Sequence, residues 1–132
     1  MMKNQTYRMT MLFDFYGELL TERQKEFFDL YYNEDLSLAE IAENYGISRQ
    51  GVRDVIVRAE AAMTEIEDKT HIIRRFQQSK APIAAINDAA DRLLQSIDRR
   101  SYNDAMLDEI ARTIKENTAK LEQELLLWHL KV

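Results

Sequence analysis

Gly46 is the residue that most restricts how this chain can fold. It interrupts a helical pattern between residues 38 and 58, and glycine readily adopts the positive φ that a tight turn between two helices requires. Two short helices that cross at a steep angle also need a small side chain at the crossing, and Ala42 stands four residues before the glycine. This spacing predicts a helix-turn-helix.

The apolar residues around Gly46 fill the positions that a helix-turn-helix buries. These positions hold Ile41, Tyr45, Ile47, Val52 and Val55, and the residues between them are polar. An ordinary helical hairpin within a bundle is the alternative. Such a hairpin seldom fills the glycine, the alanine and all of the apolar positions together, so we interpret residues 38–58 as a helix-turn-helix.

The composition favours helices in the rest of the chain as well. Charged residues make up 31% of the 132 residues, with only three glycines and one proline. Thr21 is followed three residues later by Gln24, and Ser37 is followed in the same way by Glu40. Each pair predicts a capping box at the start of a helix. The predicted fold class is therefore all-α.

Helix lengths are predicted by apolar periodicity and by the positions of glycine and proline. Apolar residues at three- and four-residue steps predict a first helix over about residues 7–18. Ser48 is expected to cap a fourth helix, and no glycine or proline occurs between Gly51 and Pro82. This fourth helix is therefore predicted to be long and to run to about Phe76.

The last third of the chain is predicted to form a helical hairpin. Its first helix is expected to begin around Pro82, because proline is tolerated in a first turn, and residues 99–103 read as the turn. Both helices carry apolar residues at heptad-like spacing. The positions are Ile83, Ile86, Ala90, Leu93 and Ile97 in the first helix and Leu107, Ile110, Ile114, Leu121, Leu125 and Trp128 in the second.

These apolar seams have two interpretations: they fold back on the N-terminal helices, or they pair with a second subunit. Symmetric dimers are the commonest oligomers, and helix-turn-helix proteins often use two copies to bind paired half-sites. We therefore expect a homodimer held by the hairpin. The predicted organisation is a helix-turn-helix portion over residues 1–76 and a hairpin over residues 77–132 that serves as a dimerisation element.

The net charge limits how this chain can bind nucleic acid. The whole chain carries −5, and its first 62 residues hold seven Lys and Arg against eleven Asp and Glu. Phosphate binding is driven mainly by Lys and Arg that release counterions. A strong non-specific DNA binder is therefore not expected, and any contact with nucleic acid must come from a local patch.

Several classes of function lack the residues that they need. There is no cysteine, the glycines are isolated, and the only histidines are His71 and His129. These residues form no catalytic group, phosphate loop or metal-ligand spacing, so we expect no enzyme, no cofactor and no metal site. No apolar run approaches the ~20 residues of a membrane span. We expect a cytoplasmic protein without a membrane partner.

The second helix of the predicted helix-turn-helix carries the candidate nucleic-acid-binding residues. Arg49 and Gln50 stand in its first turn, where side chains reach base edges in the major groove. Asp54 opposes binding, because phosphate repels a carboxylate. The alternative is that the arginines form a solvated face or pair with Glu60. The candidate residues are Ser48, Arg49, Gln50, Arg53, Val57 and Arg58.

Two stretches of sequence also carry a family resemblance. The run from Leu36 to Asp54, LSLAEIAENYGISRQGVRD, resembles region four of sigma factors of the sigma-70 class. With the more specific run from Arg8 to Thr21, RMTMLFDFYGELLT, it makes the chain resemble the YlxM family of helix-turn-helix proteins of Gram-positive bacteria. The resemblance is close over about residues 7–76. Family members often have alanine where this chain has Gly51.

The resemblance implies a sigma region four-like helical bundle and a DNA-binding, regulatory role. It also implies a link to the signal recognition particle pathway, because genes of this family lie beside those of its components. Two hypotheses follow. The first is a helix-turn-helix regulatory protein that binds nucleic acid, DNA rather than RNA. The second is a protein- or RNA-binding accessory module of the protein-targeting machinery that no longer reads DNA, and the acidic N-terminal half favours it.

Overall fold

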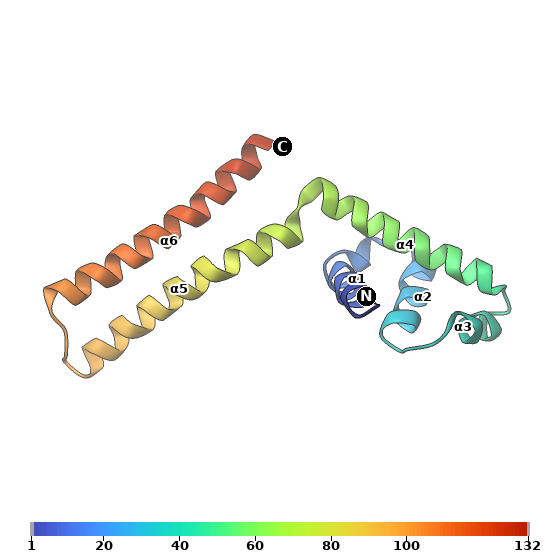
Figure 1. Ribbon diagram of the computed structural model, residues 1–132, viewed down its shortest axis with the longest axis horizontal. Coiled ribbons are helices and arrows are strands. Elements are labelled where there is room, and N and C mark those ends of the chain that lie inside the picture. Colours follow the sequence, from blue (N-terminus) through green and yellow to red (C-terminus); the bar gives the residue numbers. More distant parts are fainter. Residues whose placement is uncertain (1, 132) are drawn as a thin grey trace. The chain divides into compact units, whose positions relative to one another are not determined.

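The computed structural model describes the backbone of residues 2–131 and the side chains of residues 6–127. Within this range the chain is all-α and contains six α-helices, one short 3-10 helix and no strand (Figure 1). The elements are α1 (Met2–Tyr16), η1 (Gly17–Leu19), α2 (Glu22–Tyr32), α3 (Leu38–Tyr45), α4 (Arg49–Thr70), α5 (Ile72–Asp98) and α6 (Asp104–Lys131). Among the described residues, no helix combines the length and the apolar content that crossing a membrane requires.

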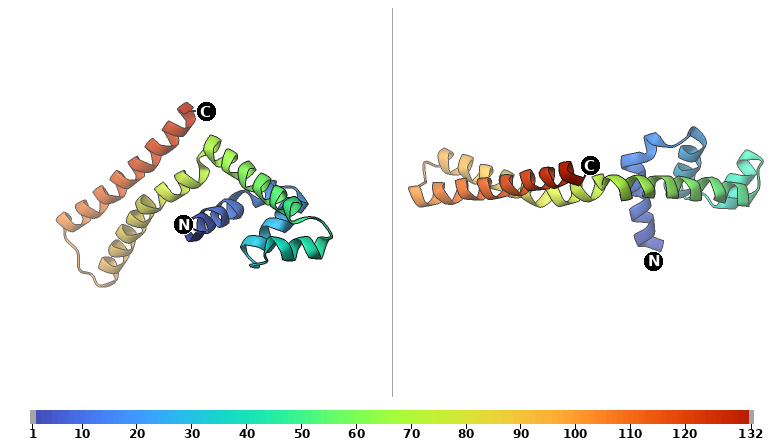
Figure 2. Two further views of the ribbon diagram at one scale, coloured as in Figure 1. Left: turned by 45° about the vertical axis from the view of Figure 1, so that its right-hand side comes forward. Right: turned by 90° about the horizontal axis from the view of Figure 1, so that it is seen from above.

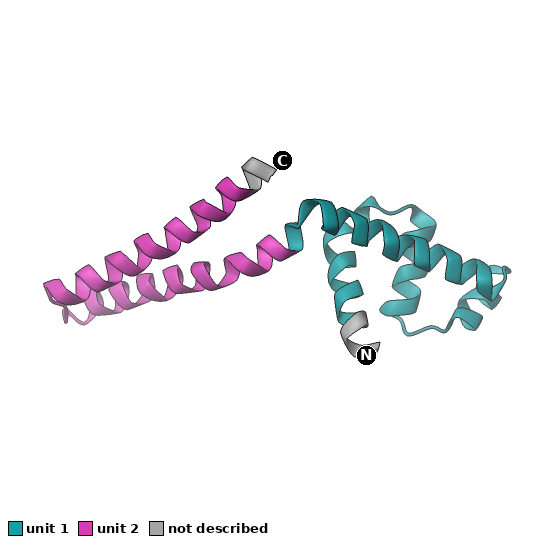
Figure 3. Cartoon of the chain, turned by 45° about the horizontal axis from the view of Figure 1, so that its top comes forward, with its two compact units in different colours: residues 1–73 teal, residues 74–132 magenta. Residues whose placement is uncertain are grey.

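The chain divides into two compact units, residues 1–73 and residues 74–132 (Figure 3). In the first unit, α1, α2 and α3 all pack against α4. Two buried clusters hold this unit together, and the adjacent residues Phe27 and Phe28 of α2 belong to different ones. Phe28 joins α1 to the middle of α4, whereas Phe27 joins α3 to its N-terminal half. Both phenylalanines are completely buried.

Short-range hydrogen bonds define where the helices of the first unit begin. Thr21 Oγ1 accepts the Gln24 N–H and the Gln24 side chain accepts the Thr21 N–H, which confirms the first capping box. Ser37 and Glu40 form the second in the same way. These bonds satisfy amide groups that a helix leaves without partners at its start. Both predicted helix starts are therefore correct.

The turn at Gly46 also has the predicted geometry. Gly46 ends α3 in the left-handed conformation, with φ of 66°. The Ala42 carbonyl accepts hydrogen bonds from the backbone N–H groups of both Gly46 and Ile47. Ser48 then caps α4, and its hydroxyl oxygen accepts the Gly51 N–H at 2.9 Å. Residues 38–58 thus form two helices joined by a short glycine turn, as the sequence predicts.

The predicted end of the fourth helix is wrong. α4 stops at Thr70, His71 adopts φ of 55°, and α5 begins at Ile72. The cause lies in Glu67, a buried carboxylate that accepts the Ile73 N–H at 3.0 Å and the Tyr16 hydroxyl at 2.5 Å. A carboxylate at a helix N-terminus stabilises its free N–H groups. The break therefore frees the Ile73 N–H for this buried carboxylate, which also accepts the Tyr16 hydroxyl.

The second unit is a hairpin in which α5 and α6 run antiparallel, side by side (Figure 2). The predicted turn over residues 99–103 joins them, and Ala89, Ser96 and Ile110 are buried. The predicted start of the first helix is wrong, because Pro82 lies inside α5 rather than in its first turn. A proline removes one backbone hydrogen bond, but the neighbouring turns keep theirs, so the helix continues through it.

The side of α5 that α6 covers includes only part of the predicted apolar seam. Ile86 and Leu93 are half-buried, but Ile83 and Ile97 are 46% and 55% exposed. Ala89 and Ser96 take the buried positions instead, and the Ser96 hydroxyl donates to the Arg92 carbonyl at 2.7 Å. The side of α5 that faces α6 is therefore rotated by one residue from the predicted seam.

Replacing Gly46 with alanine is expected to lower the free energy of unfolding by about 1–2 kcal/mol. A Cβ at this position meets no atom within 4 Å, so the left-handed backbone alone causes the loss. Gly46→Asn should lose less, because asparagine tolerates this region better. Urea unfolding measures both variants. Equal losses for alanine and asparagine would contradict this explanation.

Candidate nucleic-acid interface

The N-terminal half of α4 is held in one orientation by its buried side. Val52 is completely buried and Ile56 nearly so, both in the cluster that contains Phe27 and Ile41. Because these side chains fix the rotation of the helix about its axis, the remaining positions must face solvent. All of the candidate residues are exposed, together with Asp54. They are Ser48, Arg49, Gln50, Arg53, Val57 and Arg58.

The structure brings only part of this set together. Arg49 and Arg53 are four residues apart, which separates them by about 40° around the helix axis. Arg58 follows Arg53 by five residues and lies about 140° further round. Asp54 lies between the directions of Arg53 and Arg58. The candidate surface of α4 therefore has two arginines on one flank, one on the other, and a carboxylate between them.

None of these arginines forms an ion pair with any residue that the structure describes. The alternative partner Glu60 accepts a hydrogen bond from the Tyr32 hydroxyl instead. Asp54 accepts the side-chain amide of Gln50 at 2.9 Å. Three guanidinium groups thus remain available to a ligand, while the Gln50 amide already has a partner within the helix.

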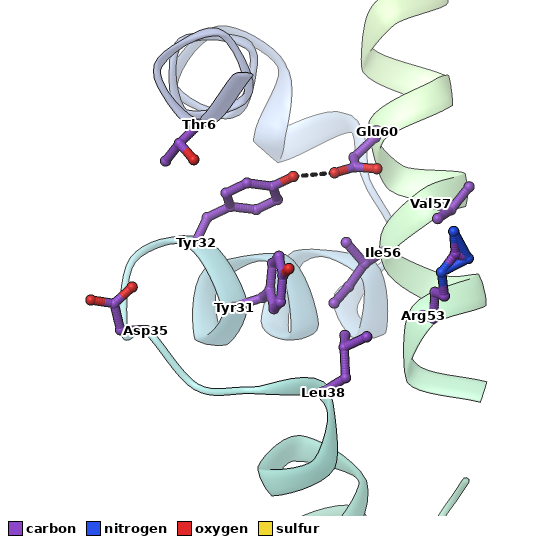
Figure 4. A pocket seen from close by; sticks show the side chains of 9 residues that line it. All are labelled: Thr6, Tyr31, Tyr32, Asp35, Leu38, Arg53, Ile56, Val57 and Glu60. Atoms are coloured by element: carbon purple, nitrogen blue, oxygen red, sulfur yellow. Dashed lines mark hydrogen bonds between the residues drawn. The ribbon is translucent and has the colours of Figure 1, made fainter. Parts of the chain in front are cut away.

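A cavity of about 310 Å³ lies beside the flank that carries Arg53 (Figure 4). α1, the end of α2, the following turn, the start of α3 and α4 all contribute to its lining. Asp35, in the turn after α2, lines this cavity and also a second cleft that Arg49 lines. The lining residues of the first cavity are Thr6, Tyr31, Tyr32, Asp35, Leu38, Arg53, Ile56, Val57 and Glu60.

Of these lining residues, only Arg53 and Val57 were singled out by the sequence as candidates for a surface contact. Tyr32 proves to be half-buried: its ring lies 4.5 Å from the Phe28 ring and its hydroxyl binds Glu60. Tyr31 and Asp35 belong to no sequence motif, and only the packing of the helices places them at the cavity. The positive φ of Asp35 (59°) marks the turn, but periodicity does not detect such a residue.

A third cleft, of about 620 Å³, lies between α1, η1 and α2 and is strongly acidic. Its one basic side chain, Lys25, pairs with Glu18 at 2.9 Å. Among the described residues there is no group of His, Cys, Asp or Glu that could hold a metal ion. The acidic residues of the cleft are Asp14, Glu18, Glu22, Glu26 and Asp29.

A protein-family model described as "Putative helix-turn-helix protein, YlxM / p13 like" matches residues 3–110. The match includes α1, the whole of α3 and α4, and the start of α6. The chain belongs to this family, UPF0122. The membership confirms the resemblance found in the sequence.

Relatives within the UPF0122 family match at 39–49% identity. A UPF0122 protein of Lacticaseibacillus casei is 39% identical over 116 residues, which cover 88% of this chain and 96% of the relative. One from Halalkalibacterium halodurans is 41% identical over 106 residues, covering 74% and 97%. One from Desulforamulus reducens is 49% identical over 82 residues, covering 61% and 70%.

Tyr32, which lines the cavity, should make the folded state of this protein sensitive to alkaline pH. Burial, and then the Glu60 carboxylate, raise the pKa of Tyr32 above its ordinary value of 10.0. Because the folded state holds this proton more tightly, its stabilisation is intact below about pH 10 and is lost as pH rises further. Each such tyrosine should contribute a fall of up to about 1.4 kcal/mol per pH unit.

Urea unfolding between pH 8 and pH 11 measures this fall. Tyr32→Phe should make the decline shallower, because the variant has no phenol proton to lose at this position. Tyr7→Phe is the matched control, since the Tyr7 side chain is 65% exposed. The assignment is wrong if both variants decline as steeply as the unmodified chain.

Proposed function

We propose that this UPF0122 protein is a regulatory protein that binds nucleic acid, DNA rather than RNA, through the exposed side of α4. One observation carries the proposal. Arg49 and Arg53 stand exposed and without ion pairs among the described residues, on a helix that a glycine turn and two buried residues hold in place. Exposed guanidinium groups on the second helix of a helix-turn-helix are the groups that contact bases and phosphates.

The positions of the arginines suggest a role for each. A helix fits the major groove with phosphate backbones on both sides. We assign Arg49 and Gln50 to base edges and Arg53 to the backbone on the same flank. Arg58, about 140° from Arg53, would contact the backbone on the opposite flank. Ser48 and Val57 complete the contact surface, and Val57 is 44% exposed.

The acidic surroundings set an upper limit on affinity and on its salt dependence. With two arginines, Arg53 and Arg58, assigned to phosphates, the slope of log affinity against log salt should lie near −2. Asp54 weakens binding by repelling phosphate. Binding should therefore depend on sequence-specific contacts more than on charge, and a second copy of the chain would add a second recognition helix for paired half-sites.

Arg49→Ala and Arg53→Ala should each lower affinity at least tenfold for a duplex selected from a random library. Arg53→Ala should also reduce the salt slope by about one, because one phosphate contact is lost. Fluorescence anisotropy at several salt concentrations measures both quantities. Arg112→Ala is the matched control: this exposed arginine pairs with Asp108 in α6, far along the sequence from α4. Unchanged affinity in both α4 variants would contradict the proposal.

The acidic cleft favours a second candidate, an accessory module that binds a protein of the signal recognition particle pathway, because carboxylates repel the phosphates of RNA as well as those of DNA. Five carboxylates line a cleft of about 620 Å³, a surface that suits a basic protein segment and repels duplex DNA. Binding to purified particle components separates the candidates. In this second case Glu22→Gln and Asp29→Asn weaken binding, whereas the two arginine variants of α4 leave it unchanged.

A further inference from the structure

Helix α5 is apolar on two adjacent sides, and α6 covers only one of them. The covered side contains Ala89 and Ser96, which are 2% and 6% exposed. A second set of apolar residues, which we call the outer stripe, remains open to solvent. Leu94 is 65% exposed and is the most open of the stripe's large residues. The outer stripe consists of Ile83, Ala90, Leu94 and Ile97.

The outer stripe is continuous and free of charge. At about 100° per residue, its four members fall within an arc of about 60°, directly beside the side that faces α6. The charged residues between positions 77 and 98 all lie on the remaining part of the helix surface. They are Lys80, Asp88, Asp91, Arg92 and Asp98. A helix that is apolar over half its circumference is typical of a bundle with more than two helices.

The spacing of the outer stripe makes it self-complementary. Ile83 precedes Ala90 by seven residues and Ile97 follows it by seven, so the large residues are placed symmetrically about the small one. Two α5 helices that cross antiparallel on a two-fold axis at Ala90 would set Ile83 of each copy against Ile97 of the other. The small Ala90 side chain lets the helix backbones approach closely, and seven-residue spacing suits helix pairing.

The register of the hairpin supports a close approach of the two copies at the level of Ala90. Arg92 contacts Glu109 at 3.5 Å and the Ser96 hydroxyl contacts the Met106 sulfur at 3.8 Å. These contacts place Ala111 of α6 at the level of Ala90, so both helices of the hairpin have small residues there. Three isoleucine and leucine side chains, each about half exposed or more, form an apolar patch of a few hundred Å², the size that marks interaction surfaces.

We propose that the outer stripe binds a second copy of this chain, with α5 antiparallel to α5 of the other copy and Ala90 at the two-fold axis. Two hairpins then close into a four-helix bundle. Three residues of this interface, Ile83, Ala90 and Ile97, belong to the apolar seam predicted from the sequence, and Ile83 and Ile97 point away from the buried side of the hairpin. The proposal is independent of what α4 binds, and its test contains no nucleic acid.

Sedimentation of the full chain at tens of micromolar should show a dimer. Leu94→Glu should raise the dimer dissociation constant at least tenfold, because it places a charge in the apolar contact. Gln95→Glu adds the same charge on the exposed opposite side of α5 and should leave the dimer intact. A monomeric unmodified chain, or a Leu94→Glu variant that remains as dimeric as the control, would overturn the proposal.

Two further variants test the antiparallel register. The chain has no cysteine, so Ala90→Cys introduces one thiol, which should form a disulfide-linked dimer under mild oxidation because the two thiols meet at the axis. Gln95→Cys should not. Ile97→Glu alone should weaken the dimer, and adding Ile83→Lys to the same chain should restore it, since the opposite charges then face each other. Equal cross-linking of the two cysteine variants, or no rescue by the second charge, would exclude this register.

If the outer stripe instead packs on the first unit of its own chain, sedimentation and thermal unfolding give different results. The unmodified chain would then sediment as a monomer, and Leu94→Glu would lower its melting temperature by several degrees more than Gln95→Glu. A monomeric unmodified chain contradicts the dimer, and so does a melting temperature that is independent of protein concentration, because association with a second copy stabilises the folded chain more at higher concentration. Circular dichroism spectra of all variants establish that the helices remain folded while these comparisons are made.

Discussion

The burial of Phe27 and Phe28 against α4 is the interaction on which the rest of the first unit depends. Adjacent residues on a helix point about 100° apart, so the two rings contact different parts of α4 and different neighbouring helices. Phe28 stacks on Phe13 of α1 at 4.7 Å, whereas Phe27 meets Tyr45 of α3 at 4.8 Å. One turn of α2 thereby fixes both α1 and the helix-turn-helix in place, and with them the rotation of α4 that exposes Arg49 and Arg53.

Three tyrosine–glutamate hydrogen bonds reinforce this packing, each between a different pair of helices. Tyr16 donates to Glu67 and joins α1 to α4, Tyr32 donates to Glu60 and joins α2 to α4, and Tyr45 donates to Glu26 and joins α3 to α2. Each bond gives a carboxylate at the edge of the apolar clusters a hydrogen-bond donor. Arg49, Arg53 and Arg58 of α4 form no ion pair among the described residues, which is the property that a phosphate-binding surface requires.

The second unit leaves apolar surface uncovered, because a two-helix hairpin cannot bury two apolar sides of one helix. α6 covers one side of α5, and the outer stripe remains for another element. The first unit presents an acidic cleft and an arginine-bearing helix, so its surfaces suit polar ligands. The two units therefore expose different kinds of surface: charged and polar in the first, and partly apolar in the second.

The sequence by itself determined the helix starts at Thr21, Ser37 and Ser48, the glycine turn, and two of the five predicted buried positions of the helix-turn-helix, Ile41 and Val52, whereas Tyr45, Ile47 and Val55 are half-buried. These features depend on groups within about four residues of one another, such as the Ser37–Glu40 capping box and the Gly46 turn, so local rules describe them. The tertiary structure decided the end of α4, near which the buried Glu67 accepts a hydrogen bond from Tyr16, 51 positions away. It also decided the cavity beside Arg53, where Asp35 meets α4, and the rotation of α5, where one residue of shift separates the buried side from the outer stripe. Heptad spacing reports that a helix has an apolar face, but which of two adjacent faces is covered depends on where the neighbouring helix packs.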